Sequence, residues 1–177
     1  PSLRLILVPR HRERFDSVAK LVRDAGVELV RRSTLESLAD RPSGAVILLD
    51  TIGELSACWG LADIAFVGGS FGNRGGQNMI EPAAFGAAVL FGPNTRNFRD
   101  VVQAFKEADA CLQLQEPEEL SPTLARLLSD QAARVSLGSA AQNTVMTQAG
   151  ATARTATLLA EVISLPPINR EHRNRAA

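Results

Sequence analysis

The sequence at residues 66–82, FVGGSFGNRGGQNMIEP, combines a strand end, a glycine-rich loop and a helix start. An apolar run at 64–67 stops at Gly68-Gly69, and five glycines lie within residues 68–76. Glycine tolerates positive φ and lets another molecule approach the backbone, and the first amides of a helix have no partner inside it. A phosphate or carboxylate fits such a place. The stretch therefore predicts an anion-binding loop, with a merely flexible connection as the alternative.

Three residues mark the start of the helix that follows this loop. Asn78 is a favourable N-cap, Glu81 stands where the partner in a capping box would be, and Pro82 lies within the first turn, where its missing N–H costs little. A defined helix start favours an ordered loop over a flexible connection.

The composition is that of a soluble globular protein. The chain has 177 residues, 45% of them hydrophobic and 21% charged, which suits one domain with a substantial core and excludes general disorder. The formal net charge is zero, so no global field favours nucleic acid or an anionic membrane. With two histidines and two distant cysteines, no metal site is indicated. We expect Cys58 and Cys111 to be buried free thiols.

The chain begins close to its first strand, which predicts that it is a fragment from which an N-terminal partner domain has been removed. No signal peptide precedes this strand, and no apolar run approaches the length that crosses a bilayer. We therefore expect a soluble and cytoplasmic piece. The charged end at 166–177 lacks apolar spacing, which predicts a loose tail after a folded domain at 1–165.

Short apolar strands alternate with helices along the chain. Strands are predicted at Leu3–Val8, Val27–Val30, Ala45–Leu49, Ile64–Val67, Ala88–Phe91 and, half polar and so at an edge, Ala110–Leu114. Helices are predicted at Arg12–Ala25, around Leu35–Leu38, and at Gly53–Leu61, Met79–Phe85, Asn97–Glu107, Glu116–Leu128, Gln131–Gln148 and Ala151–Ile163. This alternation predicts an α/β fold, a Rossmann-like doubly wound parallel sheet of about six strands with helices on both faces.

In such a sheet the ligand lies beyond the carboxyl ends of the strands. Four strand ends should therefore meet in one crevice: Pro9-Arg10-His11, Asp50-Thr51-Ile52, the glycine loop, and Gly92-Pro93-Asn94. The dinucleotide fingerprint G-x-G-x-x-G and the P-loop pattern are both absent, so neither NAD binding nor ATP hydrolysis is favoured. The phosphate loop follows the fourth strand, as in the donor half of two-domain glycosyltransferases of the GT-B architecture.

Five segments make the resemblance specific. They are LVPRHRERF (7–15), LLDTIGEL (48–55), ADIAFVGGSF (62–71), GGQNMIEPAAFG (75–86) and VLFGPNTRNFRD (89–100). In unbroken order they look like the successive motifs of 3-deoxy-D-manno-octulosonic acid (Kdo) transferases. From Cys111 onward the chain resembles that family only in its helical pattern. Three positions depart from the family motifs, namely Gln77 for His, Arg12 for Pro and Ile52 for Met.

The resemblance implies a set of residues that bind the CMP-Kdo donor. Glu81 would accept hydrogen bonds from the two ribose hydroxyls, or serve only as the capping-box partner. Gly69 and Ser70 would offer backbone N–H groups, and Ser70 a hydroxyl, to the phosphate, with Asn78 assisting unless it is only the N-cap. Arg10, next to His11, would neutralise the phosphate or the Kdo carboxylate, the alternative being an ordinary surface arginine. The cytosine would be bordered by Thr51, Ile52 and Gly53.

The resemblance also implies the setting of the reaction. The family transfers Kdo from CMP-Kdo to a lipid A precursor at the cytoplasmic face of the bacterial inner membrane, in lipopolysaccharide biosynthesis. It needs no metal or cofactor, and its catalytic base lies in the N-terminal acceptor domain, so this chain would hold no catalytic residue and would be inactive alone. Membrane contact would come only through the full-length protein. The alternatives are a GT-B transferase for another nucleotide sugar, such as a UDP-sugar, and a non-catalytic nucleotide-binding module.

Overall fold

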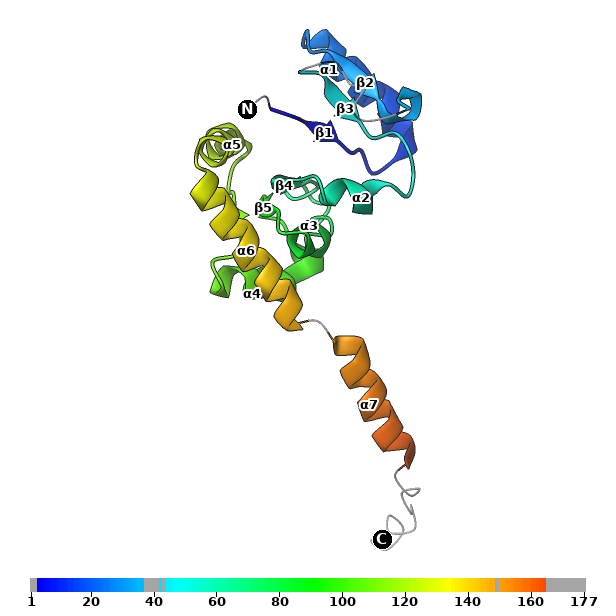
Figure 1. Ribbon diagram of the computed structural model, residues 1–177, viewed down its shortest axis with the longest axis vertical. Helices are drawn as coiled ribbons and strands as arrows, with labels where there is room; N and C mark the ends of the chain where they lie inside the picture. The colour runs from blue at the N-terminus through cyan, green and yellow to red at the C-terminus, as the bar shows by residue number, and fades with distance from the viewer. Residues whose placement is uncertain (1–2, 37–41, 43, 149, 165–177) are drawn as a thin grey trace, which may run out of the picture.

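The computed structural model describes residues 3–36, 42, 44–148 and 150–164 (Figure 1). The strands are β1 (Ile6–Leu7), β2 (Leu29–Arg31), β3 (Val46–Leu48), β4 (Ile64–Val67), β5 (Ala88–Phe91) and β6 (Leu112–Gln113). The α-helices are α1 (Phe15–Asp24), α2 (Leu55–Trp59), α3 (Ile80–Ala84), α4 (Arg99–Glu107), α5 (Leu120–Ser129), α6 (Gln131–Gln148) and α7 (Ala151–Ser164). Short 3₁₀ helices lie at Arg12–Arg14, Arg32–Thr34, Arg96–Phe98 and Pro117–Glu119.

The strands are parallel, as expected, but they form two sheets. The first sheet has the order β1-β3-β2 and the second the order β4-β5-β6, so β6 lies at an edge as predicted. The prediction of a single sheet of about six strands is therefore wrong, although the α/β class with helices packed on parallel strands is confirmed. Apolar runs reveal how many strands there are, but the pairing of their edges depends on contacts between distant segments.

The first sheet is short and partly open. β1 covers only Ile6–Leu7, not the predicted Leu3–Val8, and Leu3, Leu5 and Val8 are exposed. In the described residues β1 pairs with β3 alone, so only one side of the apolar run is hydrogen-bonded, for example from the Ile47 amide to the Leu5 carbonyl at 2.9 Å. Pairing with β3 still places the end of β1 beside the end of β3, because the Leu49 amide donates to the Leu7 carbonyl at 2.9 Å.

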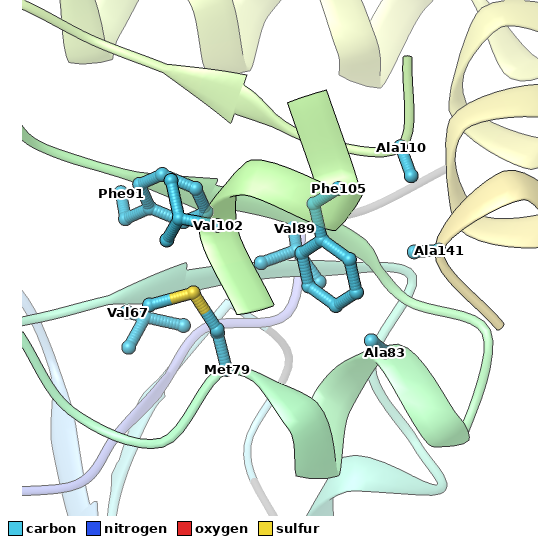
Figure 2. Packing of buried hydrophobic residues seen from close by; sticks show 9 residues of the cluster. All are labelled: Val67, Met79, Ala83, Val89, Phe91, Val102, Phe105, Ala110 and Ala141. Carbon is cyan, nitrogen blue, oxygen red and sulfur yellow. The ribbon is translucent and has the colours of Figure 1, made fainter. Parts of the chain in front are cut away.

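The second sheet carries the main core, and β5 is its central strand. Val89 and Phe91 point to one face, whereas Ala88 and Leu90 point to the other and pack against Leu127 of α5. The first cluster is contributed by the second sheet, α3, α4 and α6 (Figure 2), and comprises Val67, Met79, Ala83, Val89, Phe91, Val102, Phe105, Ala110 and Ala141. Burial on both faces explains why the run at 88–91 is apolar throughout. This packing fixes the loops at the carboxyl end of the sheet.

Helix α6 packs unusually close to the turn between α3 and β5. A β-carbon on Gly138 would lie 2.0 Å from the Gly86 carbonyl oxygen, so only glycine allows this approach. The Gln142 side chain also donates to the Ala84 carbonyl at 2.9 Å. Helix α7 continues beyond α6 and lies away from both sheets (Figure 1). The predicted loose tail at 166–177 and much of the helix predicted around Leu35–Leu38 lie outside the described residues.

Cys58 and Cys111 are free thiols, as predicted, but both are half-buried rather than buried. Burial, with a smaller contribution from Asp109, raises the pKa of Cys111 to about 11 against the opposing charge of Lys106. Among the residues that the structure describes, no group of His, Cys, Asp and Glu side chains is arranged to hold a metal ion. The same part of the chain contains no helix that combines the length and apolar character of a membrane span.

Candidate functional site

The glycine loop between β4 and α3 is held by the segment that follows β5. The side chains of Asn94, Arg96 and Asn97 donate to the carbonyls of Gly72, Asn73 and Arg74 at 2.7, 2.7 and 3.0 Å. The Asn97 amide donates to the Gly75 carbonyl at 3.1 Å, and the Gly76 amide closes the loop on the Gly69 carbonyl at 3.0 Å. Successive carbonyls of the loop, from residues 72 to 75, thus accept hydrogen bonds from residues 94–97. The loop is an ordered structure, and the alternative of a flexible connection is wrong.

Three glycines make this fold of the loop possible. Gly69, Gly75 and Gly76 have φ of +72°, +81° and +81°, which L side chains rarely adopt. A β-carbon on Gly75 would also lie 2.7 Å from Cγ of Arg96. Gly69 is half-buried, and its amide has no acceptor among the described residues. That amide is one of the two, with the Ser70 amide, that the family resemblance assigned to the phosphate.

Ser70 supports the loop from inside the protein. Its hydroxyl donates to the Val67 carbonyl at 2.7 Å and accepts from the Gly92 amide at 2.8 Å, and the residue is 0% exposed. The hydroxyl therefore joins the ends of β4 and β5. The expected contact of Ser70 with a phosphate does not fit this arrangement, because neither its hydroxyl nor its amide reaches the loop surface. Burial of a small polar residue after an apolar strand could not be read from the sequence.

Asn78 and Glu81 are coupled at the start of α3. Asn78 Oδ1 accepts from the Ile80 amide at 3.0 Å, and its Nδ2 donates to Glu81 Oε1 at 2.8 Å. The N-cap of α3 is Met79, one residue after the predicted Asn78, although the Asn78 side chain still accepts from the first amide of the helix. Glu81 contacts the Asn78 side chain instead of completing a capping box on the Asn78 amide. The Glu81 carboxylate is half-buried, and its Oε2 has no partner among the described residues, which leaves it able to accept hydrogen bonds.

A basic pocket lies between the end of β1 and the glycine loop. Its volume is about 240 Å³, and it is lined by Leu7, Val8, Pro9, Arg10, His11, Arg14, Val18 and Arg74. Arg10 donates from Nη1 to Gln77 Oε1 at 2.8 Å, which joins the first strand end to the loop. His11 lies 3.8 Å from Glu13 through Nδ1 and a carboxylate oxygen. Three guanidinium groups around one pocket favour an anionic ligand.

The turn after β3 is braced by two ionic networks. Asp50 accepts from the amide and hydroxyl of Ser33 at 2.9 and 2.8 Å and lies 3.5 Å from Arg31. Although burial alone would raise the pKa of Asp50, the Ser33 hydrogen bonds and the Arg31 charge lower it overall. Glu54 accepts from the Thr51 hydroxyl and from Arg32.

Within this turn Ile52 is 63% exposed, and Gly53 has a φ of +92°. The turn thus presents a rigid, partly apolar surface at the same sheet edge as Arg10.

The structure brings together only part of the predicted crevice. The pocket joins the first strand end with the glycine loop, and Asn94 after β5 holds that loop, but none of Thr51, Ile52 or Gly53 lines the pocket. Sequence reasoning missed Arg14 and Arg74 as lining residues and missed Gln77 as the partner of Arg10. It also missed the bracing roles of Asn94, Arg96 and Asn97, although the segment VLFGPNTRNFRD at 89–100 had already been singled out as a motif.

Comparison with known proteins finds several relatives that carry the same name. The 3-deoxy-D-manno-octulosonic acid transferase of Haemophilus influenzae is 39% identical over 160 residues, which are 90% of this chain and 37% of the relative. The enzyme of the same name from Bordetella pertussis is 39% identical over 155 residues, 88% of this chain and 36% of the relative. The chain thus spans little more than a third of the length of these curated relatives. No protein-family model matches it.

One solved structure is similar over most of the fold. It is the crystal structure of the C-terminal CMP-Kdo binding domain of WaaA from Acinetobacter baumannii, with a TM-score of 0.73 and 32% sequence identity. The similarity covers 79% of this chain and 72% of that one.

Proposed function

Because this chain belongs to the family of Kdo transferases, we propose that it is the domain that binds the CMP-Kdo donor of such an enzyme. The observation that carries the proposal is the basic pocket between the end of β1 and the glycine loop. CMP-Kdo carries a phosphodiester and a carboxylate, and guanidinium groups bind both kinds of anion through paired N–H donors. Arg10, Arg14 and Arg74 supply these donors from two sides of the pocket.

The phosphate binds beside Gly69 in this proposal. The loop carbonyls accept hydrogen bonds from the segment after β5. The Gly69 N–H has no acceptor among the described residues, so it can donate to a ligand. Arg10 reaches the same loop through Gln77. Fixed N–H donors next to a cation stabilise the negative charge that grows on the phosphate as CMP leaves.

Glu81 binds the ribose, and the turn after β3 borders the cytosine. A carboxylate has two acceptor oxygens, which suit a vicinal diol, and Asn78 occupies only Oε1 of Glu81. Thr51, Ile52 and Gly53 follow β3, at the same end of the first sheet as Arg10, and the exposed Ile52 side chain offers an apolar surface for the base.

The transfer itself requires a second domain. The bond between the Kdo anomeric carbon and the phosphate oxygen breaks, CMP leaves with the electron pair, and an acceptor hydroxyl forms the new bond. Its proton goes to a base in an N-terminal acceptor domain outside this chain. The acceptor is a lipid A precursor, and the complete enzyme works at the cytoplasmic face of the bacterial inner membrane. The residues described in this chain bind and activate the leaving group.

Calorimetric titration with CMP, UMP and NAD tests the proposal. We expect CMP to bind in preference to the other two, and Glu81→Ala to weaken CMP binding by about tenfold, as loss of hydrogen bonds to a charged acceptor would. Glu107→Ala is the matched control, since Glu107 ends α4 and bonds to Gln103 on an exposed surface. Equal binding of CMP and UMP would favour another nucleotide sugar. Absence of CMP binding to the wild-type chain would overturn the proposal.

A further inference from the structure

Gln77 occupies the junction between the basic pocket and the glycine loop. Its Oε1 accepts from Arg10 Nη1 at 2.8 Å, although the two residues are 67 positions apart in the chain. Gln77 is half-buried and Arg10 is exposed, so the glutamine is the more constrained partner.

The Gln77 side chain is itself held against the loop. A β-carbon on Gly69 would lie 3.3 Å from Gln77 Nε2 and 3.7 Å from its Cγ, so the glutamine packs over the Gly69 backbone. Its neighbour Gly76 is fixed by the hydrogen bond from its amide to the Gly69 carbonyl. One side chain therefore lies beside both groups that are proposed to bind phosphate, namely the Gly69 backbone and the Arg10 guanidinium.

The chemistry of this contact suits the orientation of a cation. An exposed arginine loses considerable rotamer entropy when it is fixed on a ligand, and a preformed hydrogen bond reduces that cost. The acceptor uses only one of the five N–H donors of Arg10, and because an amide is neutral, the positive charge stays available to an anion. A carboxylate at this position would compete with the ligand for the same guanidinium.

We propose that Gln77 is a positioning residue that holds Arg10 over the Gly69 backbone, where it meets the phosphate of the donor. This inference rests on the proposed function and deepens it. Gln77 acts through Arg10 and makes no contact with the reacting atoms. Since a glutamine amide does not titrate, the orientation of Arg10 by this contact does not change with pH.

A double-mutant cycle tests whether Gln77 affects CMP affinity only through Arg10. CMP affinity is measured by calorimetry for wild type, Gln77→Ala, Arg10→Ala and the double variant, with Gln103→Ala on the exposed face of α4 as control. We expect Gln77→Ala to weaken binding about three- to tenfold, the range of one hydrogen bond. Arg10→Ala weakens it further, and the double variant then matches Arg10→Ala within about twofold. Equal losses from Gln77→Ala with and without Arg10 would overturn the proposal.

A second variant gives a readout that packing alone would not change. In Gln77→His, neutral imidazole can accept from Arg10, whereas imidazolium, formed below a pH of about 6.5, cannot. We expect the ratio of variant to wild-type dissociation constants to rise at least about threefold from pH 8 to pH 5.5. The CMP phosphate and the pocket groups Arg10, His11, Arg14 and Arg74 are present in both proteins, so the ratio isolates the effect of the substitution.

The two failures are distinguishable. A wild-type chain that does not bind CMP contradicts the proposed function before any variant is examined. The other outcome is that the chain binds CMP, but the losses in the cycle are additive and the ratio for Gln77→His does not change with pH. That outcome leaves the proposed function standing and contradicts the role of Gln77. Unchanged thermal unfolding of each variant confirms that altered affinity does not reflect loss of fold.

Discussion

Asn78 and Glu81 are joined across the first turn of α3, with Asn78 Nδ2 donating to Glu81 Oε1 at 2.8 Å while Asn78 Oδ1 accepts from the Ile80 amide. One asparagine side chain thus accepts from the first amide of the helix and donates to the carboxylate proposed to bind ribose. Glu81 does not form the capping box that the sequence offered as its alternative role, and its binding of ribose stays a prediction. Stability and ligand affinity should therefore respond differently to each residue.

Replacement of Asn78 should lower stability more than replacement of Glu81. Asn78→Ala removes the acceptor for the Ile80 amide, which should lower the free energy of unfolding by about 1 kcal/mol. Glu81→Ala removes only one hydrogen bond between side chains and should cost less than about 0.5 kcal/mol. Urea unfolding measures both, with the exposed loop residue Asn73 changed to Ala as control. A Glu81→Ala cost equal to that of Asn78→Ala would mean that the carboxylate is chiefly structural.

Ser70→Ala should destabilise the fold at the base of the loop. The change removes a buried hydroxyl and leaves the Gly92 amide without its acceptor, at a cost of about 1–3 kcal/mol. Ser139→Ala, at an exposed position on α6, should change the free energy of unfolding by less than about 0.5 kcal/mol. A Ser70→Ala protein that unfolds at the same urea concentration as wild type would contradict the supporting role assigned to this hydroxyl.

Gly138→Ala should be destabilising although alanine favours helices. Helix propensity alone would give a gain of about 1 kcal/mol at this position in α6. The added β-carbon would lie 2.0 Å from the Gly86 carbonyl oxygen, however, and must push α6 away from the turn before β5. We expect a net loss of about 1–3 kcal/mol in the free energy of unfolding. A thermal unfolding temperature above that of wild type would show that α6 can shift without cost.

Asp50 should make stability depend on pH in the acidic range. Its pKa is lowered from 3.8 in the folded protein, so its contribution is complete above about pH 5 and is lost as the pH falls through the folded value. We expect Asp50→Asn to lower the free energy of unfolding by about 1–3 kcal/mol at pH 7, with the difference from wild type shrinking toward pH 3.

The control for this experiment shares the same arginine. Arg31 also contacts Asp16, whose side chain is 90% exposed, and an exposed ion pair contributes at most about 1 kcal/mol. Asp16→Asn should therefore have the smaller effect at pH 7. A gap between Asp50→Asn and wild type that stays constant from pH 7 to pH 3 would exclude ionised Asp50 as its source.

The sequence by itself determined two strands of the second sheet, β4 and β5, whereas β6 covers only Leu112–Gln113 of the predicted Ala110–Leu114. β4 and β5 begin and end where the apolar runs at 64–67 and 88–91 predict, because strands buried in a parallel sheet must be apolar and are bounded by glycine and proline. The start of α3 was predicted to within one residue, at Met79 in place of Ile80, because the signals of a helix start are local. The ordered motifs between 7 and 100 were sufficient to indicate the family.

Only the tertiary structure decided what depends on contacts between distant residues. Three features depend on segments that are far apart in the chain. They are the division into two sheets, the hydrogen bond from the Gly92 amide to the buried Ser70 hydroxyl, and the hydrogen bond from Arg10 to Gln77. Local propensity and periodicity carry no information about such pairs, because their geometry follows from how the packed sheets and helices bring strand ends together. The sequence therefore indicated some residues of the candidate site, such as Arg10 and Gly69, whereas packing decided which side chains lie beside them.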